Sequence, residues 1–174
     1  MAEPYSLSGV PMEKGQFCFL CDQYYEDFPD KYLMRNKEII EGIAHNRPCF
    51  FAFPDNAVKG IYWLVPISSK CEKYKVVYDK KVEKYGRCNT IRFGKVLGTN
   101  AVFLIQNMCP VTEAYISEIY VDKNNVPIRI DDRIVQDVVS NAREVLARHF
   151  RGAVLIFPDI VKIYNALRGE LESP

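Results

Sequence analysis

The chain has 174 residues, of which 48% are hydrophobic, 26% charged and 13% aromatic, and its formal net charge is +1. This composition excludes a disordered tail and a collagen-like repeat, because enough apolar surface is present to offset the entropy of ordering the chain. The length favours a single domain over residues 1–174, with flexible ends over about residues 1–14 and 170–174.

Hydropathy and cysteine usage predict a cytoplasmic protein. No apolar run approaches the roughly 18 residues that span a bilayer as a helix. The first thirty residues are acidic, whereas a secretory signal begins with basic residues. The six cysteines are scattered, and the pair Cys18 and Cys21 lacks a second pair at zinc-site spacing. We therefore expect reduced thiols that fill the core.

Periodicity and turn residues predict an α+β fold with an antiparallel, strongly curved sheet. In chain order we expect a strand over 16–21, a polar aromatic segment over 22–37, a short helix over 37–43, strands over 49–53 and 60–67 joined as a hairpin, a helix over 72–85, strands over 90–96 and 101–106, a strand over 117–122, a helix capped by Asp131 or Asp132, and a last helix opened by Pro158. Gly86 is placed to end the helix over 72–85.

The near-zero net charge hides a basic segment. Residues 70–95 contain nine lysines and arginines against three acidic residues, so the remainder of the chain is net negative. Tyr74, Tyr78, Tyr85 and Phe93 lie among these cations. Cations that follow phosphates and rings that stack on bases favour a single-stranded nucleic acid as partner. The alternative is a solvated helix face whose apolar side lies in the core.

Several catalytic classes lack their motifs. No phosphate-binding glycine loop of the G-x-x-x-x-G-K or G-x-G-x-x-G type occurs, which argues against a nucleotide-driven enzyme. The two histidines, His45 and His149, do not stand at metal-ligand spacing, and His149 is expected to be structural. We therefore predict no metal and no cofactor.

The strand over 60–67 leads into two hydroxyls and an ammonium group, Ser68, Ser69 and Lys70, beside the basic segment. Polar groups at the end of a rigid strand are typical of a functional site. The alternative is that Ser69 caps the following helix. A Ser/Lys acyl-transfer enzyme is disfavoured because the S-x-x-K spacing is absent.

Three short segments, taken together in chain order, carry a family resemblance. They are Asn46-Arg47-Pro48 before an apolar strand, Trp63-Leu64-Val65-Pro66-Ile67-Ser68-Ser69-Lys70 at the end of a strand, and Gln106-Asn107-Met108-Cys109-Pro110-Val111, which is similar to the family's N-N-M-I-P-V. Over about residues 15–170 the chain thus resembles the ToxN/AbiQ family of type III toxin–antitoxin toxins, especially its CptN-like branch.

The resemblance implies a compact, highly twisted antiparallel sheet like the MazF/Kid barrel, with helical insertions and C-terminal helices. It implies a metal-independent endoribonuclease, in which the ribose 2′-hydroxyl attacks the neighbouring phosphate and leaves a 2′,3′-cyclic phosphate and a 5′-hydroxyl. It also implies phage defence and inhibition by a small structured antitoxin RNA, usually a pseudoknot, which the toxin cuts from a repeat precursor and holds in a closed repeating assembly.

The resemblance also assigns catalytic roles. Ser68 and Ser69 match the family's hydroxyl pair, which bonds the scissile phosphate and its 2′-hydroxyl. Arg47 and Lys70 would neutralise the developing negative charge. Because the family often has a proline before this lysine, Lys73 is the alternative to Lys70. The family tyrosine has no counterpart in register, so we predict His45 as a proton-transfer group, with a helix-end role as its alternative and Tyr32 as another source of a phenol.

The basic segment is predicted to bind RNA through Lys73, Tyr74, Lys75, Lys80, Lys81, Lys84, Arg87 and Arg92. Two other functions stay open at this point. One is a non-catalytic RNA-binding module of the same shape, and the other is a protein-interaction domain with negligible affinity for RNA.

Overall fold

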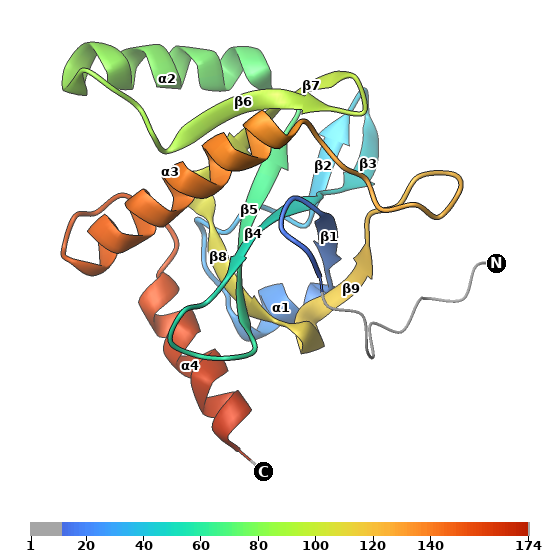
Figure 1. Ribbon diagram of the computed structural model, residues 1–174, viewed down its shortest axis with the longest axis vertical. Helices are drawn as coiled ribbons and strands as arrows, with labels where there is room; N and C mark the ends of the chain where they lie inside the picture. Colours follow the sequence, from blue (N-terminus) through green and yellow to red (C-terminus); the bar gives the residue numbers. More distant parts are fainter. Residues whose placement is uncertain (1–11, 174) are drawn as a thin grey trace.

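The computed structural model describes residues 12–173 (Figure 1). Its elements are β1 (Phe17–Leu20), α1 (Asp22–Asp27), β2 (Lys37–Ile40), β3 (Ile43–Asn46), β4 (Cys49–Pro54), β5 (Ile61–Ser68), α2 (Cys71–Tyr85), β6 (Ile91–Val96), β7 (Thr99–Leu104), β8 (Cys109–Thr112), β9 (Ile116–Ile119), α3 (Asp132–Phe150) and α4 (Ile160–Glu172), with 3₁₀ turns at Ile105–Asn107 and Glu113–Tyr115. Within this range, no helix combines the length and the apolar character that crossing a membrane requires.

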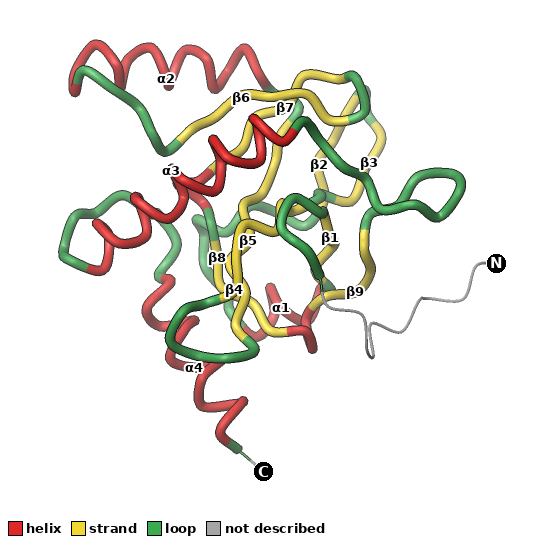
Figure 2. The backbone as a smooth tube through the Cα atoms, viewed as in Figure 1, coloured by secondary structure: helices red, strands yellow, loops and turns green. Residues whose placement is uncertain are grey.

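Seven antiparallel strands form the main sheet in the order β6-β7-β5-β4-β1-β9, with β8 also paired to β5 (Figure 2). On one edge of β5, Ile61–Leu64 pair with β8, while Ile67 and Ser68 pair with β7. The sheet therefore bends along β5, because the strands that pair with its two halves, β8 and β7, run in different directions. The predicted antiparallel α+β fold is confirmed. No pairing joins the end strands β6 and β9 within residues 12–173, so the sheet does not close into the barrel we expected.

Alternation along the central strands divides the core between two faces. Phe50 and Trp63 pack with Val138 and Val145 of α3. Their neighbours Phe51 and Leu64 point the other way and pack with α1 and α4. A third cluster lies where α2 covers β6 and β7. Helices therefore cover both faces of the sheet (Figure 1), and the chain reaches the surface just after β5, at Ser69 and Lys70.

Most predicted elements are confirmed, but the strands expected over 101–106 and 117–122 end earlier, at Leu104 and Ile119. Several predicted helix ends are also confirmed. Gly86 ends α2 in the left-handed conformation at φ 81°. The Asp131 carboxylate accepts a hydrogen bond from the amide of Arg133 and caps α3. The last helix begins at Ile160, after Pro158 and the capping residue Asp159. The predictions did not include α1 or β8.

The predicted helix over 37–43 is wrong, because these residues belong to the separate hairpin β2–β3. Glu41 and Gly42 form its turn with φ of 50° and 78°, and two consecutive positive φ angles are typical of a tight hairpin turn. Ile39 and Ile43 are 60% and 62% exposed, and the residue that β2 buries is Glu38.

The two chain ends that we expected to be flexible are described in part. Residues 1–11 and 174 lie outside the described residues. Met12 packs against the cluster that contains α1 and α4. At the other end, α4 continues to Glu172, so residues 170–172 are helical.

The six cysteines are free thiols, as expected. Cys18 and Cys49 are buried register partners on β1 and β4, close to buried Cys109. Burial raises the pKa of the Cys18 and Cys49 thiols far above its ordinary value and that of Cys109 to about 12. These three thiols therefore stay protonated and unreactive near neutral pH.

We expect iodoacetamide at pH 8 to alkylate partly exposed Cys21 while leaving Cys18, Cys49 and Cys109 unmodified in the folded protein. Peptide mass spectrometry measures the modified fraction at each position. Addition of denaturant should expose all six thiols to the reagent. Labelling of Cys49 as fast as Cys21 without denaturant would contradict the buried arrangement.

Candidate active site

The end of β5 and the hairpin β2–β3 enclose a pocket of about 400 Å³, called here the inner pocket. Ser68 and Ser69 form part of its wall, together with Glu38 of β2 and His45 and Asn46 of β3. The opposite wall comes from the turn between β6 and β7. The structure thus brings three predicted site residues, Ser68, Ser69 and His45, to one pocket.

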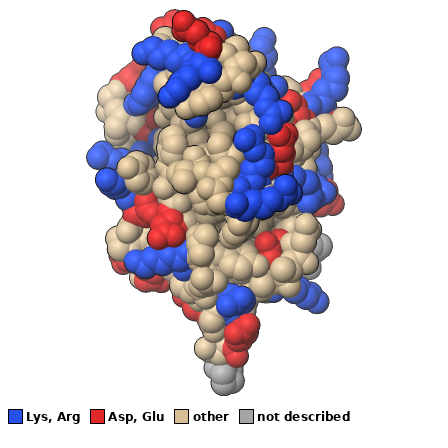
Figure 3. Space-filling model, turned by 90° about the vertical axis from the view of Figure 1, so that its left-hand side faces the viewer, with Lys and Arg blue, Asp and Glu red and all other residues tan. Residues whose placement is uncertain are grey.

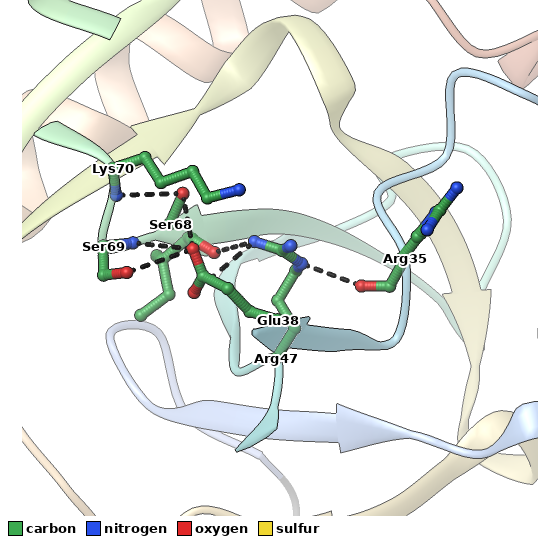
Figure 4. Close-up of polar contacts among 7 residues, drawn as sticks. Arg35, Glu38, Arg47, Ser68, Ser69 and Lys70 are labelled. Carbon is green, nitrogen blue, oxygen red and sulfur yellow. Dashed lines mark hydrogen bonds and ion pairs between the residues drawn. The ribbon is translucent and has the colours of Figure 1, made fainter. Parts of the chain in front are cut away.

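A single carboxylate oxygen joins the two serines (Figure 4). Oε1 of Glu38 accepts hydrogen bonds from Ser68 Oγ at 2.9 Å, Ser69 Oγ at 3.1 Å and the Ser69 amide at 3.2 Å. Ser68 Oγ in turn accepts from the Lys70 amide at 3.2 Å. Ser69 does not serve as the side-chain cap of α2, because its hydroxyl donates to Glu38 instead. Ser68 is 3% exposed, whereas Ser69 is an exposed residue.

Arg47 lies next to the Glu38 carboxylate but does not line the inner pocket. Its guanidinium donates to the carbonyl of Ile67 at 2.8 Å and to that of Arg35 at 2.8 Å, and it lies 3.9 Å from Glu38 Oε2 (Figure 4). The side chains of Arg47 and Glu38 are only 7% and 8% exposed. Arg47 therefore compensates a buried carboxylate and ties β2, β3 and β5 together.

His45 is the direct cross-strand partner of Glu38 in the hairpin. Such partners project from the same face of a two-stranded sheet, about 5 Å apart at their Cβ atoms. Its alternative role at a helix end is wrong, because His45 lies on a strand. A carboxylate and an imidazole thus stand side by side next to the serine pair.

A second hollow of about 610 Å³, called here the lysine hollow, begins where the inner pocket ends. Both Lys70 and Lys73 line it, and it shares Ser69, Thr99 and Asn100 with the inner pocket. A further hollow of about 760 Å³ continues from Asn100 to Lys75 and Lys95. The three hollows adjoin one another and form one track past Ser69. Because Lys70 and Lys73 both line the lysine hollow, the choice between them as the catalytic lysine stays open.

The predicted RNA-binding residues divide into two groups. Lys73, Lys80 and Lys84 are exposed on α2, and exposed Lys75 pairs with Asp79 one turn away. The other group is engaged in the fold: Tyr74 is buried, Lys81 donates to Thr90 and Gln106, Arg87 pairs with Glu144, and Arg92 forms a two-pronged pair with Asp137. On the side toward which the end of α2 points, Lys and Arg side chains lie around an uncharged area, with Asp and Glu side chains among them (Figure 3).

Two further candidates lie apart from the inner pocket. Tyr32 packs its ring against Phe157 at 6.0 Å between centroids and does not line the pocket. Nδ1 of His149 faces the amides of Leu155 and Ile156 at 3.4 and 3.3 Å, which fits its expected structural role. Among residues 12–173, no group of three or more His, Cys, Asp or Glu side chains is placed to hold a metal ion.

Sequence reasoning missed Glu38, the residue that organises the site. The signal for it was the Glu41-Gly42 turn flanked by four residues on each side. A two-residue hairpin loop there sets Glu38 opposite His45. The pattern of isoleucines instead favoured a helix, in which the two residues would not be partners.

No protein-family model matches the chain, and no curated protein matches its sequence. The fold, however, is one already seen in an RNA-cleaving toxin. The structure is similar to that of AbiQ, a lactococcal anti-phage endoribonuclease belonging to the type III toxin–antitoxin system, with a TM-score of 0.64 and 12% sequence identity. The match covers 92% of this chain and 100% of the AbiQ chain. The resemblance noted from the three sequence segments is thus supported by the fold.

We expect Arg47→Met to lower the free energy of unfolding by about 3–5 kcal/mol, because it leaves the Glu38 carboxylate buried without a cation. The double variant Glu38→Met, Arg47→Met should recover part of this loss, since no buried charge remains. Recovery should be incomplete because Arg47 also bonds two carbonyls. Urea denaturation of both variants measures the difference. An Arg47→Met protein as stable as the original would disprove this role.

Proposed function

We propose that this protein is an endoribonuclease toxin of a type III toxin–antitoxin system, acting in the cytoplasm and in phage defence. The observation that carries the proposal is the serine pair bonded to Glu38 at the border of the lysine hollow. The fold shared with AbiQ supports the same class of activity. The exposed lysines of α2 support RNA as the partner, because they attract phosphates.

The reaction we propose needs no metal ion. The ribose 2′-oxygen attacks the adjacent phosphorus, the bond from phosphorus to the 5′-oxygen breaks, and the products carry a 2′,3′-cyclic phosphate and a 5′-hydroxyl. Glu38 accepts the proton of the 2′-hydroxyl, directly or through the Ser69 hydroxyl to which it is bonded. His45, its cross-strand partner, returns a proton to the departing 5′-oxygen.

The remaining residues hold the phosphate and its charge. Each serine hydroxyl has one proton, so on RNA binding Ser68 or Ser69 turns its hydroxyl from Glu38 to a phosphate oxygen and orients the 2′-hydroxyl. Lys70 or Lys73, which both line the adjoining hollow, stabilises the negative charge that develops on the phosphorus. Arg47 is assigned a positioning role in place of the contact predicted from sequence, because it is buried and bonded to two carbonyls.

The exposed cations of α2 are proposed to bind both substrate RNA and a small structured antitoxin RNA. In this proposal the antitoxin RNA is a pseudoknot, cut by the toxin from a repeat precursor and held with it in a closed repeating assembly. Lys73, Lys75, Lys80 and Lys84 are suited to this contact because their ammonium groups reach solvent. The cations engaged with Glu144 and Asp137 hold the fold around them.

We expect the purified protein to cleave single-stranded RNA in excess chelator and to leave 2′,3′-cyclic phosphate ends, which mass spectrometry of the products detects. An RNA with a 2′-deoxyribose at the cleavage position should stay intact, because the nucleophile is missing. Tight, salt-sensitive binding without any cleavage would instead favour a non-catalytic RNA-binding module. Negligible binding would favour a protein-interaction domain.

We expect Glu38→Gln to slow cleavage by about 100- to 10,000-fold, because the amide cannot accept the proton. Ser69→Ala should slow it by about 100- to 1,000-fold through loss of a donor to the transition state. RNA affinity should change little in both variants, since both groups act mainly after binding. The matched controls are Glu26→Gln on α1 and Ser140→Ala on α3, two exposed residues that line none of the three hollows. A fully active Ser69→Ala protein would refute the assignment.

A further inference from the structure

The two hollows that meet at Ser69 differ in charge. Glu38 lines the inner pocket and neither lysine nor arginine does, whereas Lys70 and Lys73 line the lysine hollow together with Glu72. A phosphate is therefore favoured in the lysine hollow and repelled by Glu38 in the inner pocket, which leaves the inner pocket to an uncharged group. In an RNA strand, the uncharged group adjacent to each phosphate and ribose is the base.

The inner pocket has the surfaces that a base requires. Its floor contains the rings of Phe19 and Tyr120, packed edge to face with centroids 5.1 Å apart. Leu97 and Ile40, at the tips of two hairpins, form apolar walls. Leu97 is 61% exposed in the turn between β6 and β7, so a leucine stands at the mouth without being needed in the core.

Two asparagine residues are among those that line the pocket. Asn46 ends β3 on one side and Asn100 belongs to β7 on the other, and both are exposed. An asparagine amide both donates and accepts, so it matches the edge of a base. Proteins recognise single-stranded RNA by stacking bases on aromatic rings and bonding their edges with such groups.

We propose that the inner pocket binds the base of one of the two nucleotides that flank the cleaved phosphate, and that Asn46 and Asn100 determine which base is preferred. This inference rests on the proposed function. The base lies against Tyr120 and between Leu97 and Ile40, its edge meets the two amides, and the phosphate remains at the serine pair with its charge toward Lys70 and Lys73. The pocket thereby adds sequence preference to a site whose other contacts recognise only the backbone.

The test uses a short single-stranded RNA with one mapped cleavage site. Each flanking nucleotide is replaced in turn by an abasic ribonucleotide, which keeps the 2′-hydroxyl and the phosphate. We expect one of the two replacements to slow cleavage by the original protein about 10- to 100-fold, and the other to have a much smaller effect. Leu97→Ala should reduce the rate on the intact RNA and should lose most of the difference between intact and abasic RNA.

The double variant Asn46→Ala, Asn100→Ala tests the origin of the preference. Cleavage of the four RNAs that differ only at the affected nucleotide should occur at nearly equal rates, while the original protein prefers one base about 10-fold or more. Asn124→Ala, in the exposed turn after β9, is the matched control and should keep the full preference.

Two outcomes overturn the assignment of the inner pocket alone: unchanged cleavage of both abasic RNAs, or a full base preference in the double variant. Absence of cleavage of any RNA by the original protein would be a different result. It would overturn the proposed function and, with it, the inference drawn from it.

Discussion

A carboxylate that is removed from water has to be compensated inside the protein, and the Glu38 carboxylate sets this constraint for the whole site. Its partners come from segments far apart in the sequence. Arg47 follows β3 and lies 3.9 Å away, while the two serines at the end of β5 donate to one of its oxygens. Without the charge on Arg47 and these donors, β2 could not hold Glu38 against the main sheet. The same contacts that satisfy the carboxylate therefore bring the hairpin, the serines and His45 to one pocket.

The chemistry proposed for the site follows from how charge is divided around it. Glu38, His45 and the two serines line the inner pocket, and Lys70 and Lys73 line the adjoining hollow. A strand of RNA that passes Ser69 would meet apolar walls on one side and ammonium groups on the other. This division also explains why α2 matters beyond its lysines. Its first residues border the track, and its Tyr74 anchors the helix against β6 and β7.

The three sequence segments that pointed to the toxin family have different physical roles. Arg47 in the first segment bonds the carbonyl of Ile67 in the second, which is why both are needed for one pocket. In the third segment, the side-chain amide of Asn107 donates a hydrogen bond to the carbonyl of Tyr32, and that of Gln106 accepts one from Lys81. The carbonyl of Pro110 accepts a hydrogen bond from the buried hydroxyl of Tyr24. The third segment thus joins strands and helices of the core and has no residue in the inner pocket. A matching segment is therefore no guarantee of a catalytic residue.

The sequence by itself determined the strands with apolar runs, the ends of α2 and α3, and the position of the serine pair, because these depend on local periodicity and on residues such as Gly86 and Asp131 that stop or start a helix. It also indicated a basic segment, since charge is a property of composition. Only the tertiary structure decided which cations are free, since Arg92 and Lys81 are engaged by residues distant in the chain. It alone decided that 37–46 is a hairpin and that Glu38 is buried, because the donors that compensate this carboxylate come from another strand.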